Sequence, residues 1–121
     1  MKKVLLLMLC VLMVVAGCGN KEITMDDYAS RVVEVLEKYF HKEIDRSQTS
    51  TNIRHIMEDG YEEAYEDLAN KAIKEDDYTT LDKIEALYLN INKLPSAVND
   101  EERNHEVTTI YWTIKRLIEA D

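Results

Sequence analysis

The sequence predicts an all-α protein, a small antiparallel bundle of about four helices. Apolar residues recur every three or four positions through most of the chain after residue 25, and short polar links separate the periodic stretches. The stretch 107–114 contains several β-forming residues, but its apolar members follow the helical period better than strict alternation. Residues 18–121 are sufficient for one domain with a real hydrophobic core.

The first helix is expected from Asp26 to about Asp45. Thr24 is suited to the N-cap position, because Asp27 follows three residues later as in a capping box. The polar segment 47–52 breaks the apolar period and is predicted to be a loop that ends in an N-cap at Asn52. The stripe of the first helix consists of Ala29, Val32, Val33, Leu36, Phe40 and Ile44.

Three further helices complete the predicted bundle. The second covers 53–73 and contains Gly60, which marks a bend or a close helix contact. The third covers 78–94 and should end at Leu94, because Pro95 disfavours the helical conformation of the residue before it. The fourth covers 100–120, with acidic residues at its start and basic residues near its end, as the helix dipole favours.

The N-terminus has the order of an export signal. Met1, Lys2 and Lys3 provide a positive start, residues 4–15 form an uninterrupted apolar run, and two small residues follow. As a helix, the run is about 18 Å long. A transmembrane helix must cross about 30 Å of hydrocarbon, so we do not expect the run to span a membrane.

Residues Val15, Ala16, Gly17 and Cys18 resemble the lipobox of bacterial lipoproteins, although leucine is commoner than valine at the first position. The resemblance implies a diacylglyceryl thioether on Cys18 and signal-peptidase cleavage between Gly17 and Cys18. It divides the chain into a signal peptide (1–17), a lipidated cysteine with a short tether (18–24) and an extracytoplasmic helical domain (25–121). It places the protein on the extracytoplasmic face of the cell membrane, held by lipid.

The charge of the chain excludes one class of partner. The net charge is −9, and loss of Lys2 and Lys3 with the signal would leave 13 basic and 24 acidic residues, a net charge of −11. Such a surface repels nucleic-acid phosphates and anionic membrane surfaces. We therefore expect attachment through the lipid and a protein partner with a basic face.

Catalytic and metal motifs are incomplete. Cys10 would leave with the signal, so the mature chain would lack a thiol for a disulfide, a zinc site or nucleophilic catalysis. His105 and Glu106 begin like a zinc-protease helix, but Thr109 stands where the second histidine is required. Glu102 and His105 match one half of a di-iron motif without its other ligands. We expect no enzyme activity, no cofactor and no metal.

Two features remain as candidate contact sites. The first is an acidic ladder whose main members are Glu58, Glu62 and Glu66, for which a solvated surface is the simpler explanation. The second is Trp112, which the helical wheel places away from the apolar stripe, together with the similarly misplaced Leu89. An exposed tryptophan is a favoured interface anchor, whereas a neighbouring segment that folds over it is the alternative.

These observations predict a non-catalytic protein that binds or modulates a membrane or cell-envelope partner. The chain resembles the small helical lipoproteins of Gram-positive bacteria and their mobile elements. Such proteins include exclusion and immunity factors, which is the most specific hypothesis. The alternative is a solute- or ion-binding lipoprotein, which is disfavoured because this short domain lacks the two-lobed cleft of transport receptors.

Overall fold

The computed structural model describes residues 24–120 and confirms the all-α class. Five α-helices are present in this range: α1 (Met25–Phe40), α2 (Arg46–Met57), α3 (Tyr61–Lys74), α4 (Tyr78–Val98) and α5 (Asn104–Glu119). A single 3₁₀ turn, η1 (Glu101–Arg103), precedes α5. The predicted lipidation and cleavage residues, Cys18 and Gly17, lie outside the described residues.

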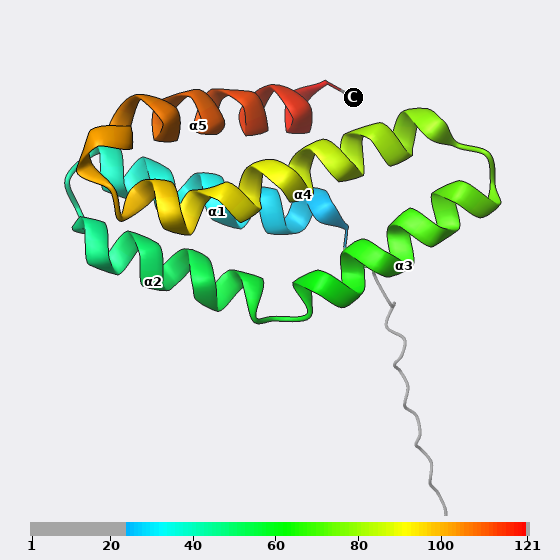
Figure 1. Ribbon diagram of the computed structural model, residues 1–121, viewed down its shortest axis with the longest axis horizontal. Helices are drawn as coiled ribbons and strands as arrows, with labels where there is room; N and C mark the ends of the chain where they lie inside the picture. The colour runs from blue at the N-terminus through cyan, green and yellow to red at the C-terminus, as the bar shows by residue number, and fades with distance from the viewer. Residues whose placement is uncertain (1–23, 121) are drawn as a thin grey trace, which may run out of the picture.

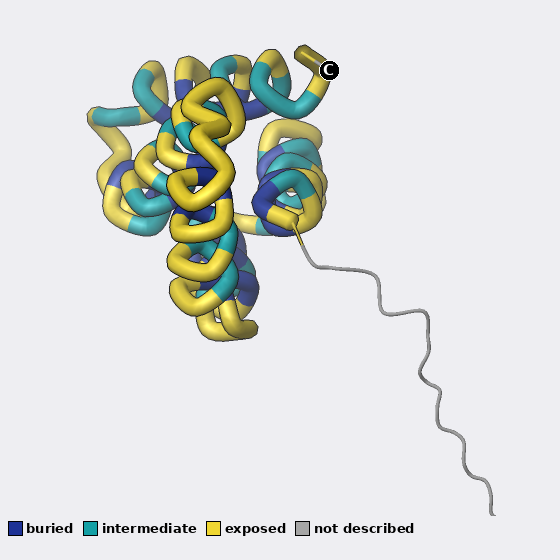
Figure 2. The backbone as a smooth tube through the Cα atoms, turned by 90° about the vertical axis from the view of Figure 1, so that its right-hand side faces the viewer, coloured by how far each residue is buried: buried dark blue, intermediate teal, exposed yellow. Residues whose placement is uncertain are grey.

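Helix α4 lies at the centre of the arrangement and contacts each of the other four helices. In Figure 1, α2 and α3 follow one another in a bent row along one edge, and α5 lies along the opposite edge. The buried stretches of the backbone face the middle of the molecule and the exposed stretches face outward (Figure 2). The core therefore forms around α4, between the two edges, and each outer helix contributes one apolar face to it.

The start of α1 agrees with the prediction. The Thr24 hydroxyl accepts a hydrogen bond from the Asp27 N–H (3.3 Å), and the Asp27 carboxylate accepts one from the Thr24 N–H (3.0 Å). This is a complete capping box, which satisfies two backbone donors that the helix itself cannot satisfy. The predicted start of the third helix at Tyr78 is also confirmed, with Asp77 as the N-cap.

The predicted loop at 47–52 and the N-cap at Asn52 are wrong, because these residues lie inside α2. The actual N-cap is Asp45, whose carboxylate accepts from the Gln48 N–H at 2.8 Å, while the Gln48 side chain accepts from the Asp45 N–H at 2.9 Å. The Thr49 hydroxyl donates to the Asp45 carbonyl at 2.7 Å. Polar residues thus form the first turns of the helix, since they satisfy its backbone groups locally.

The predicted second helix is in fact two helices, so the bundle contains five helices and not four. Helix α2 ends at Met57 and α3 begins at Tyr61, with Gly60 between them at φ 74°. Only glycine adopts this left-handed conformation at little cost, so the chain turns here. The Tyr28 hydroxyl donates to the Asp59 carbonyl at 2.7 Å and anchors the turn to α1.

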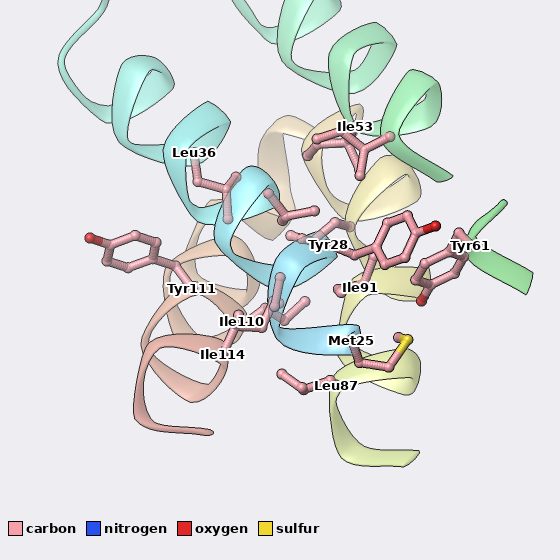
Figure 3. Close-up of a cluster of buried hydrophobic side chains, with 14 of the residues drawn as sticks. Met25, Tyr28, Leu36, Ile53, Tyr61, Leu87, Ile91, Ile110, Tyr111 and Ile114 are labelled. Carbon is pink, nitrogen blue, oxygen red and sulfur yellow. The ribbon is translucent and has the colours of Figure 1, made fainter. Parts of the chain in front are cut away.

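Tyr61 then fixes the start of α3 against α4. Its hydroxyl donates to the Tyr88 carbonyl (2.9 Å) and lies 3.1 Å from the Asn92 side-chain oxygen. The Tyr28 and Tyr61 rings meet edge to face, with centroids 5.6 Å apart, and the two side chains lie beside one another in the core (Figure 3). The turn at Gly60 is therefore held from both α1 and α4.

Two predicted helix ends are also wrong. Helix α1 ends at Phe40 and not near Asp45, because Lys42 takes a left-handed conformation (φ 61°) and the Glu43 N–H bonds back to the Lys38 carbonyl at 2.9 Å. This is a Schellman ending without its usual glycine. Helix α4 continues through Pro95 to Val98. The proline removes one backbone hydrogen bond, but the last turn buries Ala97 and Val98 completely, which offsets the loss.

The Asp45 capping box gives a stability prediction. Asp45→Ala removes the side-chain acceptor at the start of α2 and should lower the free energy of unfolding by about 1 kcal/mol. Ser47→Ala changes an exposed residue in the same turn and should leave it nearly unchanged. Denaturant unfolding followed by circular dichroism measures both variants, and equal losses would contradict the capping role of Asp45.

The turn at Gly60 gives a second prediction. Gly60→Ala should lower the free energy of unfolding by about 1 kcal/mol, because alanine is strained at a positive φ. The added Cβ would lie 3.5 Å from the Tyr28 hydroxyl, an ordinary contact, so a steric clash is not the cause. Gly60→Asn should lower the free energy of unfolding by less, since asparagine tolerates this conformation better than alanine. Thermal unfolding checks the order, and an alanine variant as stable as the parent chain would refute it.

Candidate functional site

Trp112 belongs to a row of aromatic side chains on the surface formed by α1 and α5. The aromatic row consists of Tyr39 and Phe40, at the end of α1, and Tyr111 and Trp112, in the middle of α5. Neighbouring ring centroids are 5.8 Å apart for Tyr39 and Phe40, 5.0 Å for Phe40 and Tyr111, and 5.1 Å for Tyr111 and Trp112. The last two pairs are nearly edge to face, a favourable geometry for aromatic rings.

The rings of the row differ in burial. Tyr111 is 7% exposed, whereas Trp112 is 54% exposed and Phe40 is 36% exposed. Tyr111 lies on the outer side of the core, with its hydroxyl directed away from it (Figure 3). The exposed indole therefore rests on a packed ring, so its orientation is partly fixed before any partner binds.

Glu37 and Lys115 connect the row to a polar network. The Tyr111 hydroxyl donates to Glu37 Oε2 at 2.8 Å. Burial and this hydrogen bond raise the pKa of Tyr111 to about 12, so the hydroxyl remains a donor throughout the physiological range. Lys115 Nζ lies 3.9 Å from Glu37 Oε2 and 5.7 Å from the centroids of both the Tyr111 and the Trp112 rings. The amine thus contacts the faces of two rings and one carboxylate.

Two open hollows flank the aromatic row. One has a volume of about 340 Å³ and is lined by Tyr39, Phe40, Lys42, Asn104 and Thr108. The other, which we call the α1–α5 hollow, has a volume of about 220 Å³ and is lined by Ser30, Val33, Glu37, Lys115, Ile118 and Glu119. Both are shallow surface features, of a kind that receives side chains of a partner more readily than it encloses a small molecule.

The charge is distributed unevenly over the molecule. The segment 58–77 contains nine acidic and two basic residues, whereas α5 contains two of each. Helices α3 and α5 both pack on α4 and do not contact each other; Figure 1 shows them on opposite edges. Helix α1, which carries Tyr39 and Phe40, contains four acidic and two basic residues. The aromatic row therefore lies on a less acidic surface than the segment 58–77, so contact there has a lower desolvation cost.

The other predicted site residues lie elsewhere. Leu89, on α4, is 57% exposed and is not part of the aromatic row. Glu58 caps the end of α2, and Glu66 is exposed on α3. Glu62 is already engaged, because the Tyr88 hydroxyl donates to its carboxylate at 2.8 Å. The structure thus does not gather Trp112, Leu89 and the acidic ladder into one site.

His105, the histidine of the two incomplete metal motifs, is exposed on α5. Its neighbour Glu106 pairs with Arg103 at 2.8 Å, and this bond lowers the pKa of Glu106. Within residues 24–120, no group of three histidine, cysteine, aspartate or glutamate side chains is placed to hold a metal ion.

Sequence reasoning missed three members of this site. The sequence pattern places Phe40 on the buried stripe of the first helix, whereas the structure leaves it 36% exposed in the aromatic row. The helical period also places Tyr111 on the core side of the last helix, and its burial is confirmed, but its ring contacts with Phe40 and Trp112 are not apparent from the sequence. From the sequence alone, Lys115 is one of the basic residues near the end of the last helix, where the helix dipole favours them. Its spacing to Tyr111 and Glu119 is four residues, which places all three on one side of α5 and could have suggested the cluster. The partnership with Glu37 depends on how α1 packs against α5.

Comparisons with family models, curated proteins and solved structures find no match to this chain. Across residues 24–120, no helix combines the length and the apolar character needed to cross a membrane.

The unequal burial of the two neighbouring rings gives a prediction. Trp112→Ala should change the free energy of unfolding by less than about 1 kcal/mol, because much of the indole is in water. Tyr111→Ala should lower it by about 3 kcal/mol or more, because a buried ring is lost. Equilibrium unfolding by circular dichroism measures both. A large loss for Trp112→Ala would mean that the indole is part of the core and is not a free surface.

Proposed function

We propose that the chain is a lipid-anchored, non-catalytic binding protein on the extracytoplasmic face of the cell membrane. In this proposal Cys18 carries the lipid, and the folded domain binds or modulates a membrane or cell-envelope protein through the surface around Trp112. The main observation in favour of this binding surface is the exposed Trp112 indole at the end of the aromatic row, which packs on the Tyr111 ring. Tryptophan is one of the residue types enriched at the energetic centres of protein interfaces.

The N-terminal sequence supports the membrane part of the proposal. Two acyl chains on Cys18 would hold a domain stably at a bilayer, whereas one gives only marginal binding. Only about six residues separate Cys18 from α1, a reach of roughly 20 Å when fully extended. A domain held so close meets neighbours in the same membrane at a high effective concentration, so even a modest binding surface suffices.

The resemblance to small helical lipoproteins gives the most specific version of this proposal, an exclusion or immunity factor. Such a factor blocks the entry machinery of a phage or conjugative element at the recipient membrane. A solute- or ion-binding role is the alternative. The two differ in what the lipidated protein retains, a stoichiometric protein in the first case and a small ligand in the second.

Affinity purification of the lipidated full chain from its own membranes tests the proposal. A membrane or envelope protein should co-purify in stoichiometric amount, and Trp112→Ala should reduce its recovery about tenfold, the scale of an interface anchor. Cys18→Ala should release the chain from the membrane. Ile73→Ala is the matched control, because Ile73 is similarly exposed but lies on α3; its recovery should be normal.

Equal recovery with Trp112→Ala and with the parent chain would refute the role of the aromatic surface. Recovery of a small ligand in place of a protein would favour the solute-binding alternative. An intact Met1 and an unmodified Cys18 thiol in the native polypeptide, seen by mass spectrometry, would refute the lipid anchor.

A further inference from the structure

The Lys115 amine occupies a place that suits a cation. Two aromatic rings face it at 5.7 Å, and two carboxylates flank it, Glu37 Oε2 at 3.9 Å and Glu119 Oε2 at 4.0 Å. Aromatic faces and carboxylates both attract positive charge. Both carboxylate distances exceed that of a direct hydrogen bond, so the intramolecular contacts are loose and can be exchanged.

The charges in the α1–α5 hollow do not balance. Glu37 and Glu119 contribute two negative charges, and Lys115 supplies one positive charge. The hydrogen bond from the Tyr111 hydroxyl orients the Glu37 carboxylate but adds no charge. One negative charge therefore remains without a counter-charge within the hollow even when Lys115 is present, so the hollow attracts a cation from outside.

The same hollow also offers apolar surface. Val33 and Ile118 line it, and both pack against the core from a partly buried position. Phe40 and Trp112 lie exposed at the adjoining aromatic row. Because α1 and α5 pack side by side, this apolar surface lies between two helices, where an amphipathic helix of a partner can place its apolar side chains.

We propose that the α1–α5 hollow binds an amphipathic helix of the partner protein. The apolar side chains of that helix would contact Val33, Ile118 and Trp112. A lysine or arginine of the same helix would lie between Glu37 and Glu119. The inference rests on the proposed function and specifies the chemistry of its partner. Lys115 holds the cation position in the free protein and moves aside when the partner's cation enters. An anionic lipid surface and a second, equally acidic copy are both disfavoured by the net charge of −9.

Photo-crosslinking in the protein's own membranes tests this inference. A photoreactive residue replaces Ser30, which is exposed and lines the hollow, in the lipidated full chain. The adduct should map to a partner segment of helical periodicity with a lysine or arginine one turn from apolar residues. Glu37→Gln combined with Glu119→Gln should lower the adduct yield about fivefold, as expected for the loss of partly exposed ion pairs.

Lys115→Gln should have the opposite effect and raise the adduct yield, because the internal competitor for the two carboxylates is removed. Arg116→Gln is its matched control, since it removes the same charge from the next residue, which lines a different hollow; the yield should stay unchanged. Glu58→Gln combined with Glu66→Gln removes two acidic charges outside the hollow and should also leave the yield unchanged. Circular dichroism of the purified chains confirms that each variant is folded.

Several results would overturn the inference. One is an adduct with lipid, with a second copy of the chain or with a segment that lacks basic residues. Another is an equal loss of adduct yield in the Glu37/Glu119 and the Glu58/Glu66 double variants. Partner recovery could depend on Trp112 while the adduct yield stays unchanged in the Glu37 and Glu119 variants. That result would refute this inference and leave the proposed function intact. A partner that is recovered independently of Trp112 would refute the proposed function itself.

Discussion

Burial of the apolar side of α4 is the constraint that arranges the helices. Six of its residues are buried: Ile84, Leu87, Ile91, Leu94, Ala97 and Val98. Each large aliphatic side chain stabilises the fold by about 1.5–3 kcal/mol when it is removed from water. No single helix can cover a stripe of this length, so α1, α2, α3 and α5 each contribute an apolar face to it. The turns between the helices direct each of these four helices onto the apolar side of α4.

The same constraint determines where the candidate site lies. Val107, Ile110 and Ile114 of α5 must face the core, and all three are buried. With 3.6 residues per turn, Trp112 then has to point outward, and Tyr111 falls at the edge where α1 is packed. The aromatic row is thus a consequence of how α5 covers the core. Its exposed end is held by rings that are already packed, which limits the entropy lost when a partner binds.

The sequence predicted the helical class, the capping box at Thr24 and the outward direction of Trp112 correctly, because each depends on local spacing. It failed where local signals were missing or were overridden. Lys42 takes a left-handed conformation at the end of α1, where glycine would be the usual signal. Pro95 predicts that the helix ends at Leu94, yet burial of the following turn outweighs the cost of the proline. Contacts such as Tyr111 with Glu37 join residues far apart in the chain, and the register between two helices is not encoded in the period of either.

The function proposed here depends on the indole of Trp112 being open to solvent before any partner arrives. It is the only tryptophan of the chain, so its fluorescence reports on this position alone. The most direct measurement is the emission spectrum of the purified chain at low protein concentration, with quenching by a water-soluble agent. We predict an emission spectrum close to that of indole in water, and ready quenching. A strongly blue-shifted emission that resists quenching would contradict it.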